Sequence, residues 1–401
     1  MKHRCIRVFL ALNLPGGIAI GVITVMLPFV ITRAGLSVGT AASVVAIGLA
    51  PLSMRILWAP IADLTLTYKA WYRIGAMSAA LMLLLISTVP ISLQTVWLLA
   101  GAAFTLKAGT TLAQLPAAGL MALAVPKPLQ GRAAAYFQIG AKVGTGLGGG
   151  AGVWMAYHFG GRLAGGAVLA AACVASIGAL AFVREPERPV NRGAFRTRLA
   201  SVGSDLWAII RSRRGAFVLA VVITPIGAGA ASNLWSAVAP EWHVAPNTIA
   251  LVSGVGATVA STLGCLFAGW WADRADRRLV FLSTGAVMAL VGAAVAAGPR
   301  LPVAFVVGTL AYSGVGGMCD AAYSALILSV IGGTAAASQY TVLTALGNLP
   351  NSYMTALDGH VHDKWGTAAM LGLEALLGGA LVAAAAAVVR KQPRIPPEPP
   401  A

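Results

Sequence analysis

The sequence predicts an all-α membrane protein whose twelve transmembrane helices form two pseudo-symmetric halves of six. Of its 401 residues, 58% are hydrophobic and only 10% are charged, and the mean hydropathy is +0.81. A soluble domain carries about 25% charged residues. Many apolar runs reach the ~20 residues that a helix needs to cross a bilayer, and they are too long and uniform for barrel strands. The predicted spans cover residues 8–31, 38–62, 72–91, 95–125, 132–157, 162–183, 215–240, 245–271, 279–298, 302–331, 335–357 and 366–389.

The net charge of +16 follows the membrane topology rather than a nucleic-acid partner. Most of the 28 Lys and Arg residues fall in the segments that share one side with both termini. The opposite loops hold only Arg33, Arg162, Arg300 and Lys364. This asymmetry is the positive-inside pattern and places both termini in the cytoplasm. We expect a multi-pass protein of a bacterial inner (plasma) membrane that contacts lipid, binds no nucleic acid and is a monomer.

The first apolar run continues to about residue 31, which is too long for a cleaved signal peptide, so we interpret it as the first span. The four Cys residues form no close-spaced pair and indicate neither a disulfide framework nor a zinc site. The sequence implies no cofactor and no bound metal.

One offset relates two pairs of unusual residues. Asp63 and Asp273 are 210 positions apart, and so are Pro15 and Pro225. A repeated offset indicates two similar halves, and the prolines are expected to break or bend the first and seventh spans. The predicted units are an N-terminal half (1–183), a basic cytoplasmic linker with an amphipathic helix (184–214), a C-terminal half (215–390) and a Pro-rich cytoplasmic tail (391–401).

Both aspartates lie between the second and third spans of their half, each beside basic residues. The second motif, GWWADRADRR at 269–278, contains Asp273, Arg274, Arg277 and Arg278. An Asp at a helix end can pair with Arg side chains and helix N-termini of the other half, which predicts a cytoplasmic gate. The alternative is that these charges only set topology, but acidic residues contribute little to that rule.

Six plus six spans around a basic loop, together with the 269–278 motif, resemble the major facilitator superfamily. LSMRILWAPIAD at 52–63 resembles the AmpG-type muropeptide permease branch and its acetyl-CoA transporter relatives, with Arg55, Trp58, Pro60 and Asp63 at the matching positions. GGMCDAAYSALIL (316–328), SQYTVLTAL (338–346) and GAKVGTGLGGGAG (140–152) resemble the same branch. The stretch LAQLPAAGL departs from it, with Gln114 and Ala118 where that branch has carboxylates.

The resemblance implies the major facilitator fold and secondary transport by alternating access, with substrate bound between the halves. Transported substrates in related branches include muropeptides, iron–siderophore complexes and acyl-CoA. Three alternatives remain open: a drug or metabolite efflux antiporter, a non-transporting sensor or assembly factor on a transporter fold, and a membrane-embedded enzyme. The enzyme alternative is disfavoured because the 12 acidic residues form no Asp-rich diphosphate motif.

Ionisable side chains within the predicted spans are the candidate pathway residues, because such a group costs ~2.5–3.5 kcal/mol at the bilayer centre on insertion scales. We expect Lys107 and Lys142 to hold an anionic part of a small-molecule substrate. Asp320, with Glu374, is expected to take up a proton. A structural Lys–Asp ion pair is the alternative. The pathway is extended by three polar residues that could equally be interhelical hydrogen-bond partners: Gln138, Asn233 and Tyr323.

The stretch DGHVHDKWG at 358–366 gathers Asp358, His360, His362 and Asp363 between the last two predicted spans. It resembles a metal-entry site, but alternate His spacing is not the helical i, i+4 geometry. We therefore expect an outer loop or helix end here.

Overall fold

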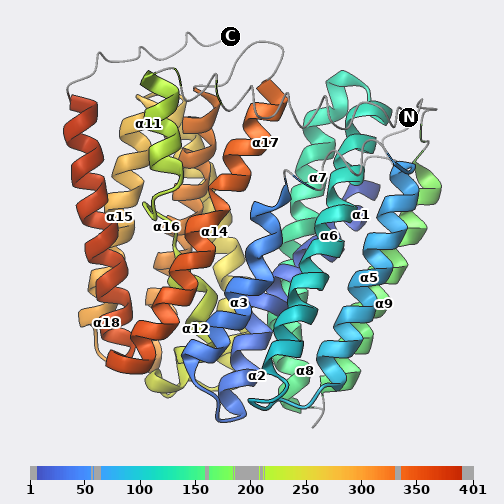
Figure 1. Ribbon diagram of the computed structural model, residues 1–401, viewed down its shortest axis with the longest axis horizontal. Coiled ribbons are helices and arrows are strands. Elements are labelled where there is room, and N and C mark those ends of the chain that lie inside the picture. The colour runs from blue at the N-terminus through green and yellow to red at the C-terminus, as the bar shows by residue number, and fades with distance from the viewer. Residues whose placement is uncertain are drawn as a thin grey trace.

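The computed structural model describes residues 7–55, 65–158, 162–183, 213–329 and 336–390, and positions 57, 185, 207 and 211. Helices cross the bundle twelve times, and the two halves stand side by side (Figure 1). Eight described helices are long and apolar enough to cross a membrane. The predicted all-α fold of twelve membrane helices is confirmed, since the remaining crossings share one long helix or are built from shorter elements. We call the end that holds Val8 and Arg390 the upper end and the opposite end, at the kink near Gly366, the lower end.

The N-terminal half contains spans one to six, and three of them consist of more than one element. Their bounds are α1 (Val8–Gly21), η2 (Val22–Met26) and α2 (Leu27–Arg33) for span one; α3 (Val38–Ser53) for span two; α5 (Tyr68–Thr88) for span three; α6 (Val96–Ala124) for span four; α7 (Lys127–Gly146), η3 (Leu147–Ala151) and α8 (Gly152–His158) for span five; and α9 (Arg162–Gly178) with η4 (Ala179–Phe182) for span six.

The C-terminal half contains spans seven to twelve. Their bounds are α11 (Arg213–Val222), η6 (Ala230–Leu234), α12 (Trp235–Val238) and η7 (Ala239–Trp242) for span seven; α13 (Pro246–Ile249), η8 (Ala250–Gly256) and α14 (Ala257–Ala272) for span eight; α15 (Arg277–Ala297) for span nine; α16 (Pro302–Leu328) for span ten; and α17 (Ala336–Leu346) with α18 (Asn348–Arg390) for spans eleven and twelve.

Short polar side chains begin several helices by accepting otherwise unpaired backbone N–H groups. Ser37 precedes α3 and accepts the N–H of Thr40 at 3.1 Å. Thr67 does the same for α5, and Asp276 for α15. These caps fix where spans two, three and nine begin.

Span seven is broken as predicted, whereas span one is not. α11 ends at Val222 and helix resumes only at Ala230, with Gly227 (φ 66°) and Gly229 (φ 61°) in left-handed conformations. Pro15 instead lies inside the continuous helix α1, and the irregularity of span one is the π-helical turn η2. Of the predicted break or bend, a break at Pro15 is not found, because a helix interior can absorb one missing N–H.

Of the two alternatives predicted for 358–366, an outer loop or a helix end, the structure shows the helix end. α18 remains helical past Lys364 and turns only at Gly366, whose φ of 78° and ψ of 179° are non-helical. Asp358 and His360 therefore belong to span eleven. The Asp358-Gly359 pair is a turn signal in the sequence, but here the glycine stays helical and packs against α3.

The halves meet closely near the lower end through glycines of spans two and eleven. A Cβ on Gly39 would lie 2.3 Å from Asp363 Oδ2, and one on Gly359 would lie 2.2 Å from the Cβ of Ala42. Both glycines lack a side chain where the two backbones approach, which is how helices pack tightly in a bilayer.

Spans five and eight cross in the same way. A Cβ on Gly254 would lie 2.7 Å from the Cα of Gly150. Spans one and seven add a buried hydrogen bond in which Ser236 Oγ donates to the Val25 carbonyl at 2.7 Å. Three contacts between the halves therefore close the lower part of the seam.

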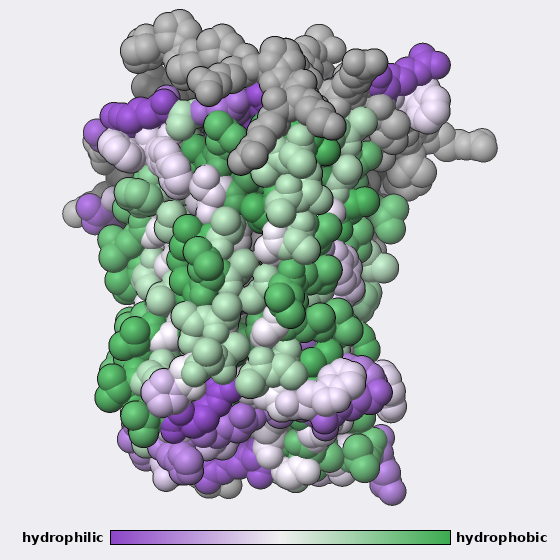
Figure 2. Space-filling model, turned by 90° about the vertical axis from the view of Figure 1, so that its left-hand side faces the viewer, coloured by the Kyte–Doolittle hydropathy of each residue, from purple (hydrophilic) through white to green (hydrophobic). Residues whose placement is uncertain are grey.

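The surface matches a membrane setting. Figure 2 shows a broad apolar band around the middle of one face, with polar residues gathered above and below it. Exposed apolar side chains on the described helices include Leu81, Leu266 and Leu376. An apolar belt between two polar rims is what the hydrocarbon core and headgroups of a bilayer require.

We predict that Gly359→Ala lowers the stability of the purified protein by about 1–3 kcal/mol, because the new methyl meets atoms of α3 that cannot all move away. Thermal unfolding in detergent measures this. Gly372→Ala on the same helix is the matched control, since nothing lies within 4 Å of its added Cβ. Equal melting temperatures for both variants would contradict the glycine contact.

Candidate functional site

The break in span seven is the centre of the candidate site. Backbone groups between Val222 and Ala230 leave the helical ladder, and a bilayer offers no water to replace those bonds. Side chains of spans eleven and twelve take their place. Other parts of the C-terminal half must therefore supply hydrogen-bond partners for the backbone groups of the break.

Glu374 from span twelve holds the lower edge of the break. Its carboxylate accepts the N–H of Ala230 at 2.9 Å and the N–H of Ala231 at 3.3 Å, at the start of η6. The Tyr312 hydroxyl of span ten donates to the same carboxylate at 2.7 Å. Glu374 and Tyr312 are both buried. Three donors surround one carboxylate, which is the arrangement that stabilises a buried negative charge.

Span eleven supplies the neutral partners. The Asn233 amide donates to Asn351 Oδ1 at 2.7 Å and to Thr355 Oγ1 at 2.9 Å. Asn351 in turn donates to the Ala228 carbonyl at 3.3 Å, within the break. Asn233, predicted as a pathway residue, is therefore a bridge between spans seven and eleven.

Asp358 continues the same polar face of span eleven. It follows Asn351 and Thr355 at helical spacing of i, i+4 and i+7. It is 0% exposed, and neither carboxylate oxygen has a hydrogen-bond partner among the described residues. Its main electrostatic neighbour is Glu374. The spacing in the sequence was the available signal for this residue, and the loop assignment concealed it.

An aromatic cluster covers this polar centre on its lower side. The ring of Trp235 lies 5.5 Å from that of Tyr312 and 6.1 Å from that of Phe305. Trp242 packs on Phe305 at 5.8 Å between centroids. All four are buried, so the aromatic cluster separates Glu374 from the lower surface.

Lys142 and Asp320, both predicted pathway residues, belong to different halves and face the same seam. Lys142 and Asp320 interact electrostatically, and both also interact electrostatically with Cys265 of span eight. Both side chains are exposed, and no ion pair within 4 Å joins them in the described part of the chain. Asp320 nevertheless lies well inside α16. The electrostatic interaction between a Lys and an Asp on opposite halves changes whenever the separation of those halves changes.

Lys107 occupies a different place. It is 0% exposed and donates to the Gly16 carbonyl of span one at 3.4 Å. The charge that acts on it is that of Arg55, whose buried Nε has no hydrogen-bond partner within the described ranges. The structure therefore does not bring Lys107 together with Lys142 and Asp320. It groups two cations inside the N-terminal half.

Two further predicted pathway residues make ordinary contacts. Tyr323 donates to the Leu343 carbonyl at 2.8 Å and so joins spans ten and eleven. Gln138 is exposed on α7.

Of the predicted gate residues, Trp58, Pro60 and Asp63 fall outside the described residues, and Asp273, Arg274, Arg277 and Arg278 lie at the upper end. Asp273 and Arg274 are exposed at the end of α14. Arg274 donates to the Trp270 carbonyl at 3.0 Å and stacks over that ring. Arg277 begins α15 and is half-buried. The gate stays a prediction.

Arg278 pairs with Asp276 rather than with Asp273. Its guanidinium meets both carboxylate oxygens of Asp276, at 3.2 and 2.9 Å, while Asp276 also caps α15. Sequence reasoning passed over Asp276 because Asp273 matched the repeat offset.

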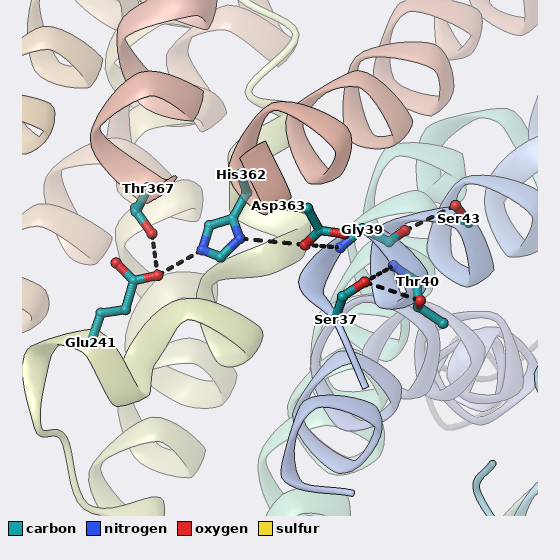
Figure 3. A network of polar contacts seen from close by, with 8 residues as sticks. All are labelled: Ser37, Gly39, Thr40, Ser43, Glu241, His362, Asp363 and Thr367. Atoms are coloured by element: carbon teal, nitrogen blue, oxygen red, sulfur yellow. Dashed lines mark hydrogen bonds and ion pairs between the residues drawn. The ribbon is translucent and has the colours of Figure 1, made fainter. Parts of the chain in front are cut away.

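A second polar network joins the halves at the lower end (Figure 3). Glu241 of η7 contacts His362 Nε2 at 2.6 Å and accepts from Thr367 Oγ1 at 2.6 Å. His362 Nδ1 lies 3.7 Å from Asp363 Oδ1, which accepts the Gly39 N–H at 2.9 Å across the seam. We call these residues the lower lock. Asp363 sits at the N-terminus of α3, where helix amides favour a negative charge.

Glu241 is the residue of the lower lock whose pKa is shifted by its surroundings. Partial burial alone would raise its pKa, but hydrogen bonds from His362 and Thr367, with the charges of His362 and Arg300, hold the pKa of this carboxyl below its ordinary value. A lowered pKa means that ionised Glu241 stabilises the folded state above the ordinary carboxyl pKa, and that this contribution is lost as the pH falls through the lowered value.

With the geometry described, the comparisons identify the class. The sequence model of the Major Facilitator Superfamily matches residues 9–349. The chain therefore belongs to the Major Facilitator Superfamily, a family of membrane transporters rather than enzymes. No curated protein is significantly similar to it in sequence.

Solved structures share the fold along the whole chain. A POT family transporter in complex with a thioalcohol-conjugated peptide has a TM-score of 0.75 at 10% identity, covering 97% of this chain and 96% of its own. A nucleoside transporter has 0.72 at 16% identity, with 96% and 99% covered. A D-xylose–proton symporter has 0.67 at 14% identity, with 94% and 97% covered. At these identities the likeness establishes the fold alone.

We predict that Glu241→Gln lowers the melting temperature at neutral pH, and that its difference from the wild type shrinks as the pH falls through the lowered pKa of Glu241. The reason is that protonation removes from the wild type the charge that Gln never carries. Thermal unfolding over a pH series measures it, and the acidic end is the internal control. A difference that does not change with pH would contradict the lower lock.

Proposed function

We propose that this protein is a secondary active transporter that moves a small anionic solute across a bacterial inner membrane by alternating access, coupled to protons. The observation that carries the proposal is the placement of Lys142 and Asp320 on opposite halves, exposed at one seam. A solute anion that binds Lys142 competes with Asp320 for it, and protonation of Asp320 removes that competitor. Anion and proton then favour the same rearrangement.

The alternating-access part is supported by the closed lower seam. Glycine contacts between spans two and eleven and between five and eight, with the lower lock, hold the halves together at one end. Transporters of this superfamily rock their halves about a central site. A lock made of hydrogen bonds and small-residue contacts can be broken and re-formed without unfolding a helix.

The preference for an anion is supported by the cations of the N-terminal half. Lys107 and Arg55 are near neighbours of like charge, and within the described ranges neither forms an ion pair. Two like charges held close inside a membrane protein repel unless a negative group joins them. A carboxylate or phosphate of the solute would supply it.

Orientation and branch rest on the sequence. The basic residues support a cytoplasmic location for both termini, in which case the lower end faces outward and the proposed gate at Asp273 faces the cytoplasm. The motif at 52–63 supports a muropeptide- or siderophore-permease-like protein. Inward and outward transport are both compatible with this placement.

We predict that vesicles containing the protein take up at least one member of a panel of anionic metabolites when a pH gradient is applied. Right-side-out and inverted vesicles, each at two pH values, measure direction and coupling. Lys142→Gln should lower uptake, because the anion loses its cation. Asp320→Asn should make uptake insensitive to pH, because the proton loses its acceptor.

Lys364→Gln is the matched control, since it removes an exposed lysine at the lower end and should leave uptake unchanged. Absence of pH-driven flux for every panel member would reject proton-coupled anion transport. Unaltered pH dependence in Asp320→Asn would reject the role of that residue alone.

A further inference from the structure

Asp358 is a carboxyl group in a place that offers it no partner. It is fully buried in span eleven, and both its oxygens lack hydrogen bonds from the described residues. Its electrostatic neighbour is another carboxyl, Glu374. A buried unpaired carboxylate costs several kcal/mol, so such a group must be neutralised by something that the protein chain does not provide.

The two carboxyls are not equivalent. Glu374 accepts two backbone N–H groups and the Tyr312 hydroxyl, so its negative charge is compensated by three donors. Asp358 accepts none. Two neighbouring carboxyls in a dry site hold one negative charge far more easily than two. The charge therefore resides on Glu374, and Asp358 carries the proton.

The ionisable groups around the pair are few. From span ten, Tyr312 faces it, and Cys319 is a neighbour of Tyr312. Elements α3 and η6 carry no ionisable side chain, and those of α15, Arg277 and Arg278, lie at its upper end. Along the described part of the bundle, no cation is placed to compensate an ionised Asp358.

The crevice beside Glu374, the ionised member of the pair, fits a proton and excludes a solute. This crevice of about 10 Å³ reaches Glu374 and Tyr312 between spans seven, nine, ten and twelve. That is room for about one water molecule. The aromatic cluster closes the lower side. A metabolite has no room there, whereas a single water can pass a proton.

We propose that Asp358 is a second proton-binding site, and that its proton controls how Glu374 holds the break in span seven. This rests on the proposed proton-coupled transport. In the step, the O–H bond of Asp358 breaks, the bonding electrons stay on the carboxylate, and the proton passes to water. Two adjacent carboxylates then repel each other, and this repulsion strains the hydrogen bonds that Glu374 accepts from the N–H groups of Ala230 and Ala231.

Infrared difference spectra of the reconstituted full-length protein, between acidic and alkaline buffer, test the site without any solute. A protonated buried carboxyl gives a C=O stretching band that shifts in D₂O. We expect this band to be lost in Asp358→Asn and kept in Asp363→Asn, a matched change on the same helix at an exposed position. A band retained in Asp358→Asn, or absent from the wild type, would overturn the proposal.

Replacing Na⁺ by choline should leave that band unchanged, and a Na⁺-dependent band would overturn the proton in favour of a metal cation. If Asp358→Asn does not give monodisperse protein, Tyr312→Phe serves instead. It removes a donor to Glu374 and should shift the same band, and an unshifted band would count against the pair.

Transport assays test whether the proton of Asp358 is coupled to solute movement. Asp358→Asn should lose pH-driven uptake but retain exchange of solute at equal pH, because only the proton step is removed. Retained pH-driven uptake would overturn the coupling role. If the wild type moves no panel solute, the proposed function fails, and the infrared result still decides whether Asp358 holds a proton.

Discussion

The interrupted backbone of span seven is the constraint on which the C-terminal half depends. A helix that opens inside a bilayer leaves N–H and C=O groups that only protein can satisfy. Glu374 and Asn351 satisfy them from spans twelve and eleven. Each of those residues is itself fixed by another, Tyr312 and Asn233 respectively. Spans seven, ten, eleven and twelve are consequently joined through one polar centre rather than only through side-chain packing.

The same break separates two parts of span seven that have different attachments. The lower part, from η6 to η7, carries Ser236, which bonds to span one, and Glu241, which belongs to the lower lock. The upper part, α11, packs within the C-terminal half. A helix interrupted by two left-handed glycines can bend there at little cost. The lower part can therefore follow the N-terminal half while the upper part remains with its own.

The length of the apolar runs and the repeated offset were sufficient to predict the fold. A bilayer requires helices of about one length, and few other structures pair every backbone group within it. The break at Pro225 was predictable from proline with nearby glycines. The candidate functional site was less predictable from the sequence. Lys107, Lys142 and Asp320 were singled out as charges within the predicted spans, but their grouping depends on how helices rotate about their axes, which hydropathy does not determine. Asp358 was missed because the last two spans are joined by a single kink at Gly366.

Opposite charges are divided between the halves in a way that gives the proposed coupling a physical reason. Arg55, Lys107 and Lys142 belong to the N-terminal half, and the buried or seam-facing carboxyls Asp320, Asp358 and Glu374 to the C-terminal half. In a medium of low dielectric constant the ionised members of the two sets attract each other across the seam. An anion neutralises the first set and protons neutralise the second. Either alone removes the attraction but leaves the other set charged and uncompensated, which is costly inside a membrane protein. Movement of anion and proton together is the condition under which the halves separate at least cost.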